Sequence, residues 1–366
     1  MKIAVYAICK NEEKFVKRFL DSCKDADGVF ILDTGSTDGT KRAAIVWAAE
    51  KDIANKVNWA ESVFTPWRFD VARNAALGLV PEDYDLCIAL DLDEVLPEGW
   101  RAEVEKVWRP GVHQVRYEFA WNHHPDGTPD VRYWAQKIHS RLGWRWAKPV
   151  HEILKWDANY NMVSVDCSIL VHHWADDTKP RTSYLPLLEL SVKEEPDDDR
   201  NAHYYARELM NYGYPDRALL EFDRHLRLPA RFPAERAASR RYMAEIEAKK
   251  GNTDAQLFHL REAVKESPDT REPWVSLALA LYKAGDHPGA YAAAKAALEI
   301  RVRPRIYISS EYAWNSTPWD IAAVCAYVMG RYEEALALGD EAARLAPTDA
   351  RIQQNLVHYK QKAATG

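Results

Sequence analysis

Three carboxylates follow a short apolar run in the first half of the chain. Residues 84–90 are mostly apolar, and Asp91, Asp93 and Glu94 come directly after them. In an extended strand, residues i and i+2 point to the same side, so Asp91 and Asp93 would converge if that geometry persists. Hard oxygen ligands suit Mg²⁺ or Mn²⁺, and such an ion binds phosphates. We therefore expect a divalent-metal site here, with an acidic turn or helix cap as the structural alternative.

Asp33 occupies a similar position after a second apolar run, residues 29–32. It opens a polar turn over residues 33–40 that holds two glycines and leads into a helical pattern. Short polar side chains in such a turn suit a ribose or a base. The turn is not a phosphate loop, because it lacks the P-loop lysine and the GxGxxG pattern. Helix capping by Thr37 and Asp38 is the alternative interpretation.

A third polar cluster lies within residues 67–74. Its candidate binding residues are Arg68, Asp70, Arg73 and Asn74. Two arginines and an aspartate within six residues can bind a diphosphate or a sugar hydroxyl through charge-assisted hydrogen bonds. The alternative is an amphipathic helix whose polar face is solvated.

Strand and helix patterns alternate through residues 1–175. Apolar runs predict four strands, at 3–8, 29–32, 56–60 and 84–90, with helical spacing over 12–23 and a further helix that extends to residue 49. This βαβα order implies a mostly parallel sheet that is covered on both faces. Open sheets of this kind bind ligands at the carboxyl ends of their strands, which is where Asp33 and Asp91 fall.

Residues 180–366 follow a different pattern, in which a helix, a glycine, an alanine-rich helix and a proline recur. The recurring glycines are Gly213, Gly251, Gly285 and Gly330. This recurring order, with a period near 34 residues, matches tetratricopeptide repeats. An unrelated helical bundle is the alternative. The longest interval contains an insertion over residues 301–317. We therefore expect an α/β domain over 1–195 and a helical repeat domain over 196–366.

Bulk composition excludes several classes of protein. The net charge of −6 excludes a generally cationic nucleic-acid binder, although a local basic patch remains compatible with it. The five cysteines form no CxxC pair, which indicates reduced, buried thiols. The N-terminus does not resemble a signal peptide, and no run reaches the ~20 apolar residues that span a bilayer. We expect a cytoplasmic protein with no membrane insertion.

A local basic and aromatic stretch covers residues 132–155. Basic residues exceed acidic ones there by five, and tryptophans lie between them. The candidate acceptor-binding residues in this stretch are Trp134, Arg141, Trp144, Arg145 and Trp146. Such a mixture suits a nucleic acid, an acidic protein or a sugar, and core tryptophans with solvated cations are the alternative. Because 8 of the 14 tryptophans lie within residues 100–174, we expect a stacking surface there.

The combination of these motifs resembles a known family. The segments AICKNEEKFVKRFLDS, DGVFILDTGSTDGT, WRFDVARNAAL and LDLDE are similar to family 2 glycosyltransferases, in particular the branch with C-terminal tetratricopeptide repeats. The resemblance covers residues 1 to about 195, and its repeat portion reaches the C-terminus. It implies a GT-A fold, which is an α/β domain with a Rossmann-like mixed sheet, followed by an all-α domain.

The resemblance also assigns roles by position. It implies a nucleotide-sugar donor, commonly a UDP-sugar, with Mn²⁺ or Mg²⁺ on the diphosphate. The implied donor-binding residues are Asn11, Glu12, Asp33, Arg73, Asn74 and Asp91, and the implied metal ligands are Asp91, Asp93 and either His172 or His173. Trp174 departs from the family pattern, because a small residue is usual there.

Family 2 enzymes invert the configuration at the anomeric carbon. The resemblance therefore implies a base that takes the acceptor proton, and a metal that neutralises the charge of the departing diphosphate. Glu152 is the first candidate for this base, His151 the second and Glu94 the third. The repeats favour a macromolecular acceptor, either a polypeptide or a hydroxylated base in DNA. The alternatives are a nucleotidyltransferase and an inactive scaffold that binds a sugar nucleotide.

Overall fold

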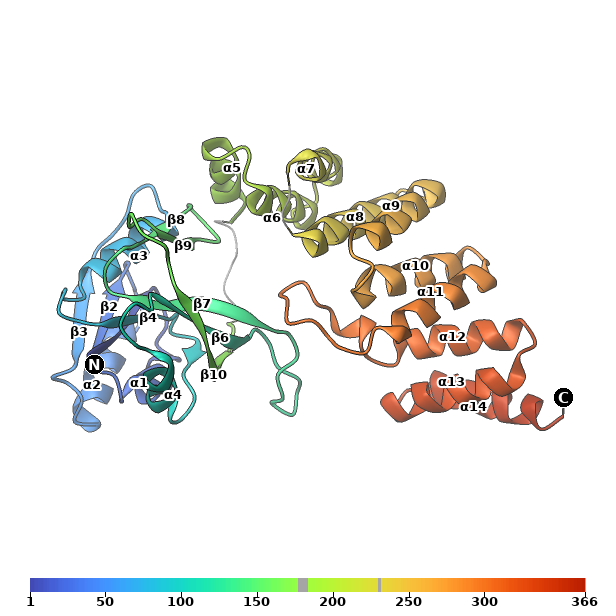
Figure 1. Cartoon of the computed structure of the whole chain (residues 1–366), viewed down its shortest axis with the longest axis horizontal. Helices are drawn as coiled ribbons and strands as arrows, with labels where there is room; N and C mark the ends of the chain where they lie inside the picture. Colours follow the sequence, from blue (N-terminus) through green and yellow to red (C-terminus); the bar gives the residue numbers. More distant parts are fainter. Residues whose placement is uncertain (177–183, 230–231, 366) are drawn as a thin grey trace. The chain divides into compact units, whose positions relative to one another are not determined.

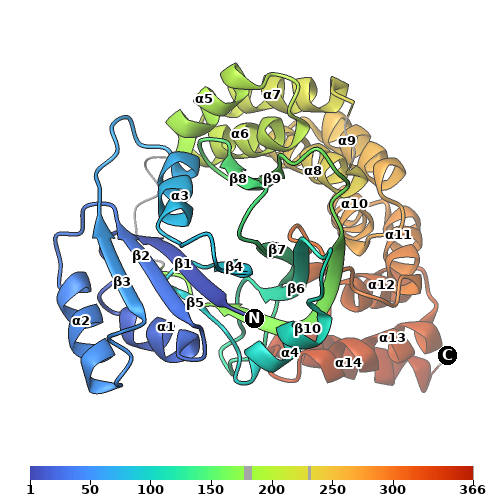
Figure 2. The same ribbon diagram turned by 60° about the vertical axis from the view of Figure 1, so that its left-hand side comes forward.

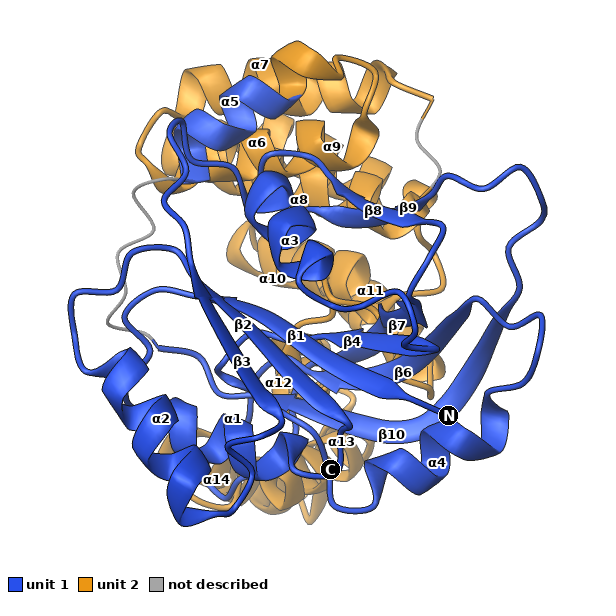
Figure 3. Cartoon of the chain, turned by 90° about the vertical axis from the view of Figure 1, so that its left-hand side faces the viewer, with its two compact units in different colours: residues 1–191 blue, residues 192–366 orange. Residues whose placement is uncertain are grey.

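The computed structural model describes residues 1–176, 184–229 and 232–365. The chain divides into two compact units, unit 1 at Met1–Ser191 and unit 2 at Val192–Gly366 (Figures 1 and 3). The division falls inside helix α5 (Tyr184–Glu194), close to the boundary expected at residue 195. Each unit has its own hydrophobic core.

Unit 1 is built on a mixed sheet. Within the described residues this sheet has eight strands in the order β3-β2-β1-β4-β7-β6-β10-β5. The strands are β1 (Ile3–Cys9), β2 (Gly28–Asp33), β3 (Val57–Glu61), β4 (Leu86–Ala89), β5 (Glu94–Val95), β6 (Gln114–Ala120), β7 (Arg132–Ser140) and β10 (Ser164–His173). The first four in spatial order are parallel, and β7 runs antiparallel to both β4 and β6.

Side-chain alternation along β1 sorts the core of unit 1 into two layers. Val5 packs in one cluster with residues of α1 (Val16–Cys23), α2 (Thr40–Glu50) and α4 (Trp100–Val107). Its neighbour Tyr6 packs in the other cluster with residues of α3 (Phe69–Gly78). Successive strand residues point to opposite faces, so these helices cover both faces of the sheet (Figure 2). Burial on both faces explains why the central strands are apolar throughout.

The order of the parallel strands reverses at β1. From β1 the chain proceeds to β2 and β3 on one side, and then crosses to β4 on the other side. Open α/β sheets bind ligands at such a switch point, outside the carboxyl ends of the strands. Asp33 ends β2 and Asp91 follows β4 closely, so both lie at this edge, which we call the carboxyl edge.

A two-stranded sheet in the described part of unit 1 carries Glu152. Strands β8 (Trp144–Ala147) and β9 (Ile153–Trp156) pair in antiparallel register, and the segment 148–152 connects them. We call residues 144–156 the β8–β9 hairpin. Lys148 and His151 in the connecting segment have φ of +85° and +48°, a region that favours glycine. Other residues remain there only where surrounding contacts fix the backbone, which identifies this segment as a constrained one.

Unit 2 consists of helix pairs that form tetratricopeptide-like repeats (Figure 1). The pairs are α6 (Asp199–Asn211) with α7 (Pro215–Arg227), α8 (Pro233–Lys249) with α9 (Thr253–Glu266), α10 (Arg271–Lys283) with α11 (His287–Glu299), and α12 (Thr317–Val328) with α13 (Tyr332–Leu345), followed by α14 (Ala350–Ala363). Each of the four recurring glycines lies in the turn within a pair, at φ of +75° to +82°. Glycine adopts this conformation without steric cost, which explains its recurrence at the turns. Among the described residues, no helix is both long and apolar enough to cross a membrane.

The insertion between α11 and α12 folds against the repeats through Glu272. The buried carboxylate oxygen Oε1 of Glu272 accepts from the main-chain N–H of Ser310 at 2.9 Å and from Nε1 of Trp314 at 3.0 Å. The hydroxyl of Ser309 donates to the same oxygen at 3.1 Å. One side chain of α10 (Arg271–Lys283) therefore organises both sides of the short helix η1 (Glu311–Ala313).

We expect Glu272→Ala to lower the free energy of unfolding by about 3 kcal/mol, because it leaves two N–H donors without their acceptor. Urea unfolding measures this loss, and limited proteolysis should cut within residues 301–317 of the variant first. Glu245→Ala is the control, since Glu245 makes an exposed pair with Lys249 that contributes under about 1 kcal/mol. Equal losses in the two variants would contradict the role of Glu272.

Candidate functional site

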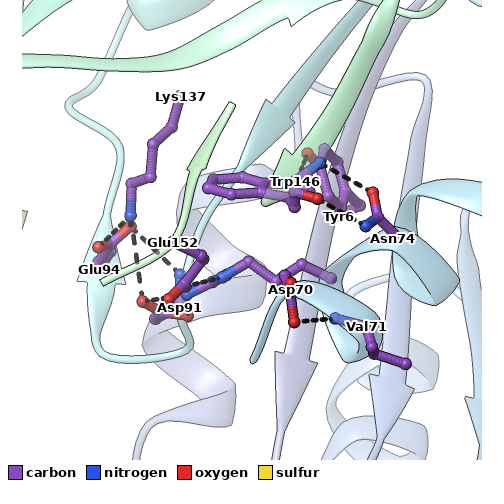
Figure 4. Close-up of polar contacts among 10 residues, drawn as sticks. Tyr6, Asp70, Val71, Asn74, Asp91, Glu94, Lys137, Trp146 and Glu152 are labelled. Atoms are coloured by element: carbon purple, nitrogen blue, oxygen red, sulfur yellow. Dashed lines mark hydrogen bonds and ion pairs between the residues drawn. The ribbon is translucent and has the colours of Figure 1, made fainter. Parts of the chain in front are cut away.

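Arg73 joins two carboxylates at the carboxyl edge. Its Nη2 donates to Oδ1 and Oδ2 of Asp91 at 2.8 and 3.1 Å, and its Nε donates to Oε1 of Glu152 (Figure 4). These side chains come from α3, the end of β4 and the β8–β9 hairpin, so three elements meet at one guanidinium. Arg73 is buried, which strengthens its charge-assisted hydrogen bonds. The structure thus brings together three residues that the sequence assigns to a site.

Opposite charges decide the protonation states of this group. Burial would raise the pKa of Asp91, but the Arg73 guanidinium, the Lys137 ammonium and the hydrogen bonds from Arg73 hold that pKa below its ordinary value. Burial would lower the pKa of Arg73, and the charges of Asp91 and Glu152 raise it instead. Asp91 and Arg73 are therefore both ionised at neutral pH.

Lys137 is a second cation at the site that the sequence pattern did not assign to it. Its Nζ lies 2.6 Å from Oε2 of Glu94 and 4.0 Å from Oδ2 of Asp91. Lys137 reaches this position because the antiparallel register sets Ile138 of β7 opposite Ile88 of β4. Burial raises the pKa of Glu94, and Lys137 only partly offsets that effect. The sequence offers no local signal that separates Lys137 from the other cations of the basic stretch.

Asp93 and His173 have the donor atoms that a divalent cation needs. Oδ1 of Asp93 is buried and has no hydrogen-bond partner among the described residues, and Oδ2 lies 3.4 Å from Nε2 of His173. Nδ1 of His173 donates to the carbonyl of Trp121 at 2.9 Å, so Nε2 is the nitrogen that faces Asp93. Burial lowers the pKa of His173, but its hydrogen bond to Asp93 and the charge of Asp93 raise that pKa above its ordinary value. A proton on Nε2 satisfies only Oδ2 of Asp93, so the buried Oδ1 still lacks a partner among the described residues. A carboxylate beside an imidazole nitrogen is a ligand pair that fits Mn²⁺ or Mg²⁺.

The other two predicted metal ligands do not join this pair. A main-chain hydrogen bond of 2.9 Å from Glu94 to the carbonyl of Asp91 closes a turn after β4, so the extended geometry needed for convergence does not persist. Asp91 therefore contacts Arg73, whereas Asp93 contacts His173. The ring of His172 instead bonds to His123 at 2.8 Å. Within the described residues, no three histidine, cysteine, aspartate or glutamate side chains are arranged to hold a metal.

The predicted nucleoside-binding residues shape two loops at the carboxyl edge. Oδ1 of Asn11 accepts from the N–H of Thr37 at 2.7 Å and so ties the loop after β1 to the loop after β2. Oδ1 of the buried Asp33 accepts from the main-chain N–H groups of residues 35 and 36. Glu12 donates its main-chain N–H to a threonine hydroxyl at the start of α2, at 2.8 Å. These contacts stabilise a preformed pair of loops beside the switch point.

Several predicted site residues contact the protein itself. Nε and Nη2 of Arg68 donate to the two carboxylate oxygens of Asp70 at 3.0 and 2.9 Å. The side-chain amide of Asn74 binds the main chain of Trp146. The ring of His151 lies 5.8 Å from the tyrosine ring that begins α5. In this structure Asn74 therefore holds the hairpin in place and does not point to an open donor site.

The predicted acceptor residues do not form one surface. Trp144 and Trp146 are buried, so they cannot stack on a partner, and that part of the prediction is corrected. Arg141 lies at the amino end of β4, because Ser140 pairs with Leu86, and its Nε donates to the carbonyl of Val80. Trp134 is 39% exposed, and Arg145 pairs with Asp157. The sequence pattern could not show this, since burial and register depend on distant strands.

A buried chain of polar groups lies beneath Arg73. Nε1 of Trp146 donates to the hydroxyl of Tyr6 at 2.7 Å, and that hydroxyl lies 2.9 Å from Nε2 of His139. Nδ1 of His139 lies 2.8 Å from the carbonyl of Ser140, and a carbonyl can only accept. Nδ1 therefore bears the hydrogen, and Tyr6 donates to Nε2. No sequence motif predicts this chain of hydrogen bonds, since its members are far apart in the sequence.

We expect His139 to make stability depend on pH. Burial lowers the pKa of His139 to about 4, whereas an unfolded histidine titrates near ~6.5. The unfolded chain therefore binds more protons between these values, and stability is lost as pH falls through that window. Unfolding should cost about 2 kcal/mol less at pH 5 than at pH 8 on account of His139. Urea unfolding of the His139→Gln variant should lack this part of the slope, and an unchanged slope would contradict the assignment.

The sequence comparisons find no match, whereas the comparison with solved structures finds similarity to part of this chain. No protein-family model matches the chain, and no curated protein matches its sequence. Among solved structures, MamA is 14% identical over 46% of this chain and 89% of its own, with a TM-score of 0.36. YrrB, a TPR protein with an unusual peptide-binding site, is 15% identical over 48% of this chain and 81% of its own, with a TM-score of 0.36.

A third solved structure is also similar to about half of this chain. A thermophilic TPR protein from Thermus thermophilus is 22% identical over 49% of this chain and 89% of its own, with a TM-score of 0.32. Similarity at this level supports no function. The tetratricopeptide-like character of unit 2 rests on its own helix pairs and glycine turns.

Proposed function

We propose that this chain is a metal-dependent, inverting glycosyltransferase with a GT-A fold in unit 1. The donor would be a nucleotide sugar, most simply a UDP-sugar, and the acceptor a nucleophilic group on a macromolecule. One observation carries the proposal: Asp91, Glu152, Arg73 and Lys137 meet at the switch point of the sheet, where α/β sheets bind ligands. Perturbed pKa values in such a position mark candidate functional sites.

In this proposal the donor would lie along the carboxyl edge. The loops that hold Asn11 and Asp33 would receive the nucleoside, and the cations Arg73 and Lys137 would lie toward the diphosphate. Asp93 and His173 would hold Mn²⁺ or Mg²⁺, which when bound supplies positive charge to the departing diphosphate.

Glu152 remains the first candidate for the base. Its Oε1 is held by Arg73, so Oε2 is the oxygen that would take the acceptor proton. The contact with Arg73 fixes the carboxylate in one orientation, and a base must be positioned within hydrogen-bond reach of its proton.

A polypeptide acceptor has more support than a nucleic acid. Three cations of the basic stretch already pair with carboxylates, namely Arg132 with Glu118, Lys137 with Glu94 and Arg145 with Asp157. The stretch therefore offers less free positive charge than its sequence suggests. Acceptor binding that weakens steeply with salt would instead favour DNA.

The deciding experiment offers the full chain a panel of UDP-sugars with Mn²⁺ or Mg²⁺. A glycosyltransferase slowly hydrolyses its donor and releases UDP only when metal is present. Release of pyrophosphate from UTP with an acceptor would identify a nucleotidyltransferase. Nucleotide binding without either product would identify an inactive scaffold and overturn the proposal.

A further inference from the structure

We infer that Trp146 is a positioning residue that fixes the Glu152-bearing hairpin against α3 and supports the guanidinium of Arg73 from below. The inference rests on the proposed function for its kinetic consequence. Its structural content, a defined place for Arg73 and Glu152, can be measured without any activity.

The main chain of Trp146 is held by one side chain of α3. Oδ1 of Asn74 accepts from the N–H of Trp146, and Nδ2 donates to its carbonyl, both at 2.8 Å. Trp146 pairs with Leu154 inside the hairpin, so Asn74 acts as a strand partner on the outer edge of β8. A further hydrogen bond of 3.0 Å runs from the N–H of Phe69 to the carbonyl of Pro149. Helix α3 is therefore hydrogen-bonded to the hairpin at two positions, Trp146 and Pro149.

The indole of Trp146 is held from the core. Its N–H donates to Tyr6, which in turn donates to His139, and all three side chains are buried. The direction of each hydrogen bond follows from the carbonyl that accepts from His139. Tyr6 lies on β1 and His139 on β7, so the ring is fixed to the central sheet on both sides of β4.

The ring of Trp146 carries Arg73. The guanidinium carbon lies 5.1 Å from the ring centroid, which is cation–π distance. Arg73 and Asn74 are consecutive on α3, so one binds the main chain of Trp146 while the other lies over its ring. Glu152, six residues after Trp146, then meets Nε of Arg73. Trp146 thus sets the relative place of the two charged groups that the proposed reaction uses.

A set of substitutions separates two roles of Trp146, the hydrogen bond that its N–H donates and the contact of its ring with Arg73. Trp146→Phe keeps a ring under Arg73 and removes the N–H, and the Tyr6 hydroxyl can still donate to His139. Tyr6→Phe instead leaves the N–H of Trp146 and Nε2 of His139 unpaired. Trp146→Leu removes the ring itself. Tyr84→Phe is the matched control, because Tyr84 packs against Phe30 just before β4 begins, away from the site.

The first measurement is independent of activity. It follows the ¹⁵N–¹H signal of the Arg73 Nε–H, identified by its loss in Arg73→Lys. We expect slow solvent exchange of this signal in the wild type and in Tyr84→Phe. Exchange should be at least about tenfold faster in Tyr6→Phe and Trp146→Leu, and only slightly faster in Trp146→Phe. Unchanged exchange in Tyr6→Phe and Trp146→Leu, well below their Tm, would overturn the inference.

The second measurement is the kinetics of donor hydrolysis. We expect kcat to fall about tenfold in Tyr6→Phe and about 100-fold in Trp146→Leu, with KM for the donor within about twofold of the wild type. A merely structural role would also lower the apparent kcat at unchanged KM, through loss of folded enzyme, so kcat is calculated per folded molecule, with the folded fraction taken from urea unfolding. If the wild type hydrolyses no donor, the proposed function fails, and the exchange measurement still decides the role of Trp146. If Trp146→Leu does not fold, Tyr6→Phe and Trp146→Phe decide it.

Discussion

Replacing Arg73 with methionine is expected to lower the free energy of unfolding by about 3 kcal/mol and to abolish any transfer activity. Methionine fills a similar volume and packs against the ring of Trp146, so the main loss is the positive charge. Without it, Glu152 would lose its ion pair, and Asp91 would keep only the more distant Lys137 ammonium, at 4.0 Å. Urea unfolding of the full chain at pH 7 measures the difference.

The pH dependence of this difference has a definite sign. In the wild type the pKa of Asp91 is lowered, so its contribution to stability is present above the unfolded pKa of ~3.9 and is lost as pH falls through the folded value. In Arg73→Met the Asp91 carboxylate binds a proton more readily, so the deficit should shrink between pH 7 and pH 4.

Arg116→Met is the matched control for Arg73→Met. Arg116 also makes a two-point contact with a carboxylate, Asp166, at 2.6 and 2.9 Å. Both side chains of that pair are more than two-fifths exposed, so its loss should cost less than about 1 kcal/mol. A similar cost for the two variants, or a deficit that does not change with pH, would show that Arg73 is an ordinary surface cation.

The parallel half of the sheet and the repeats were predictable from the sequence. Central strands such as β1 are buried on both faces, so their sequences are continuous apolar runs. Turn glycines such as Gly213 and Gly251 need a left-handed backbone, and their spacing therefore reports the helix pairs. Both signals are local, which is why single-sequence patterns contain them.

The candidate site was predictable only in part. Asp91 and Arg73 were found because strand ends and the adjacent helix share one edge of an α/β sheet. Lys137 and His139 were missed because their place depends on β7 running antiparallel to β4, a long-range pairing that no local pattern encodes. The divergence of Asp91 and Asp93 also escaped prediction, since it depends on a single main-chain hydrogen bond in the following turn.

These differences change the chemistry that the site offers. The sequence predicts one metal centre that contains both aspartates, whereas the structure gives each aspartate its own partner. Asp91 belongs to the ionic group with Arg73 and Lys137, and Asp93 belongs with His173. Substitutions at the two positions should therefore differ in their effect on stability, even if both abolish transfer.

Asp93→Asn is expected to reduce metal-dependent donor hydrolysis at least about 100-fold while leaving the metal-free protein as stable as the wild type or more so. The carboxylate of Asp93 has a buried oxygen without a hydrogen-bond partner among the described residues, which is unfavourable in the absence of a cation. An amide relieves that charge, and its NH₂ group can donate to Nε2 of His173. A ligand that binds only the folded state raises Tm, so Mn²⁺ should raise the Tm of the wild type and not that of the variant.

Asp157→Asn provides the control, since Asp157 pairs with Arg145 on the surface and should leave both the Mn²⁺ response and hydrolysis unchanged. Asp91→Ala should also abolish transfer, but unlike Asp93→Asn it leaves Arg73 with one carboxylate partner fewer and should lower stability. An equal rise in Tm with Mn²⁺ for the wild type and Asp93→Asn would show that Asp93 binds no metal. Full activity of the wild type in metal-free buffer would show that the reaction needs none, and the orphaned oxygen of Asp93 would then require another cation or a proton to satisfy it.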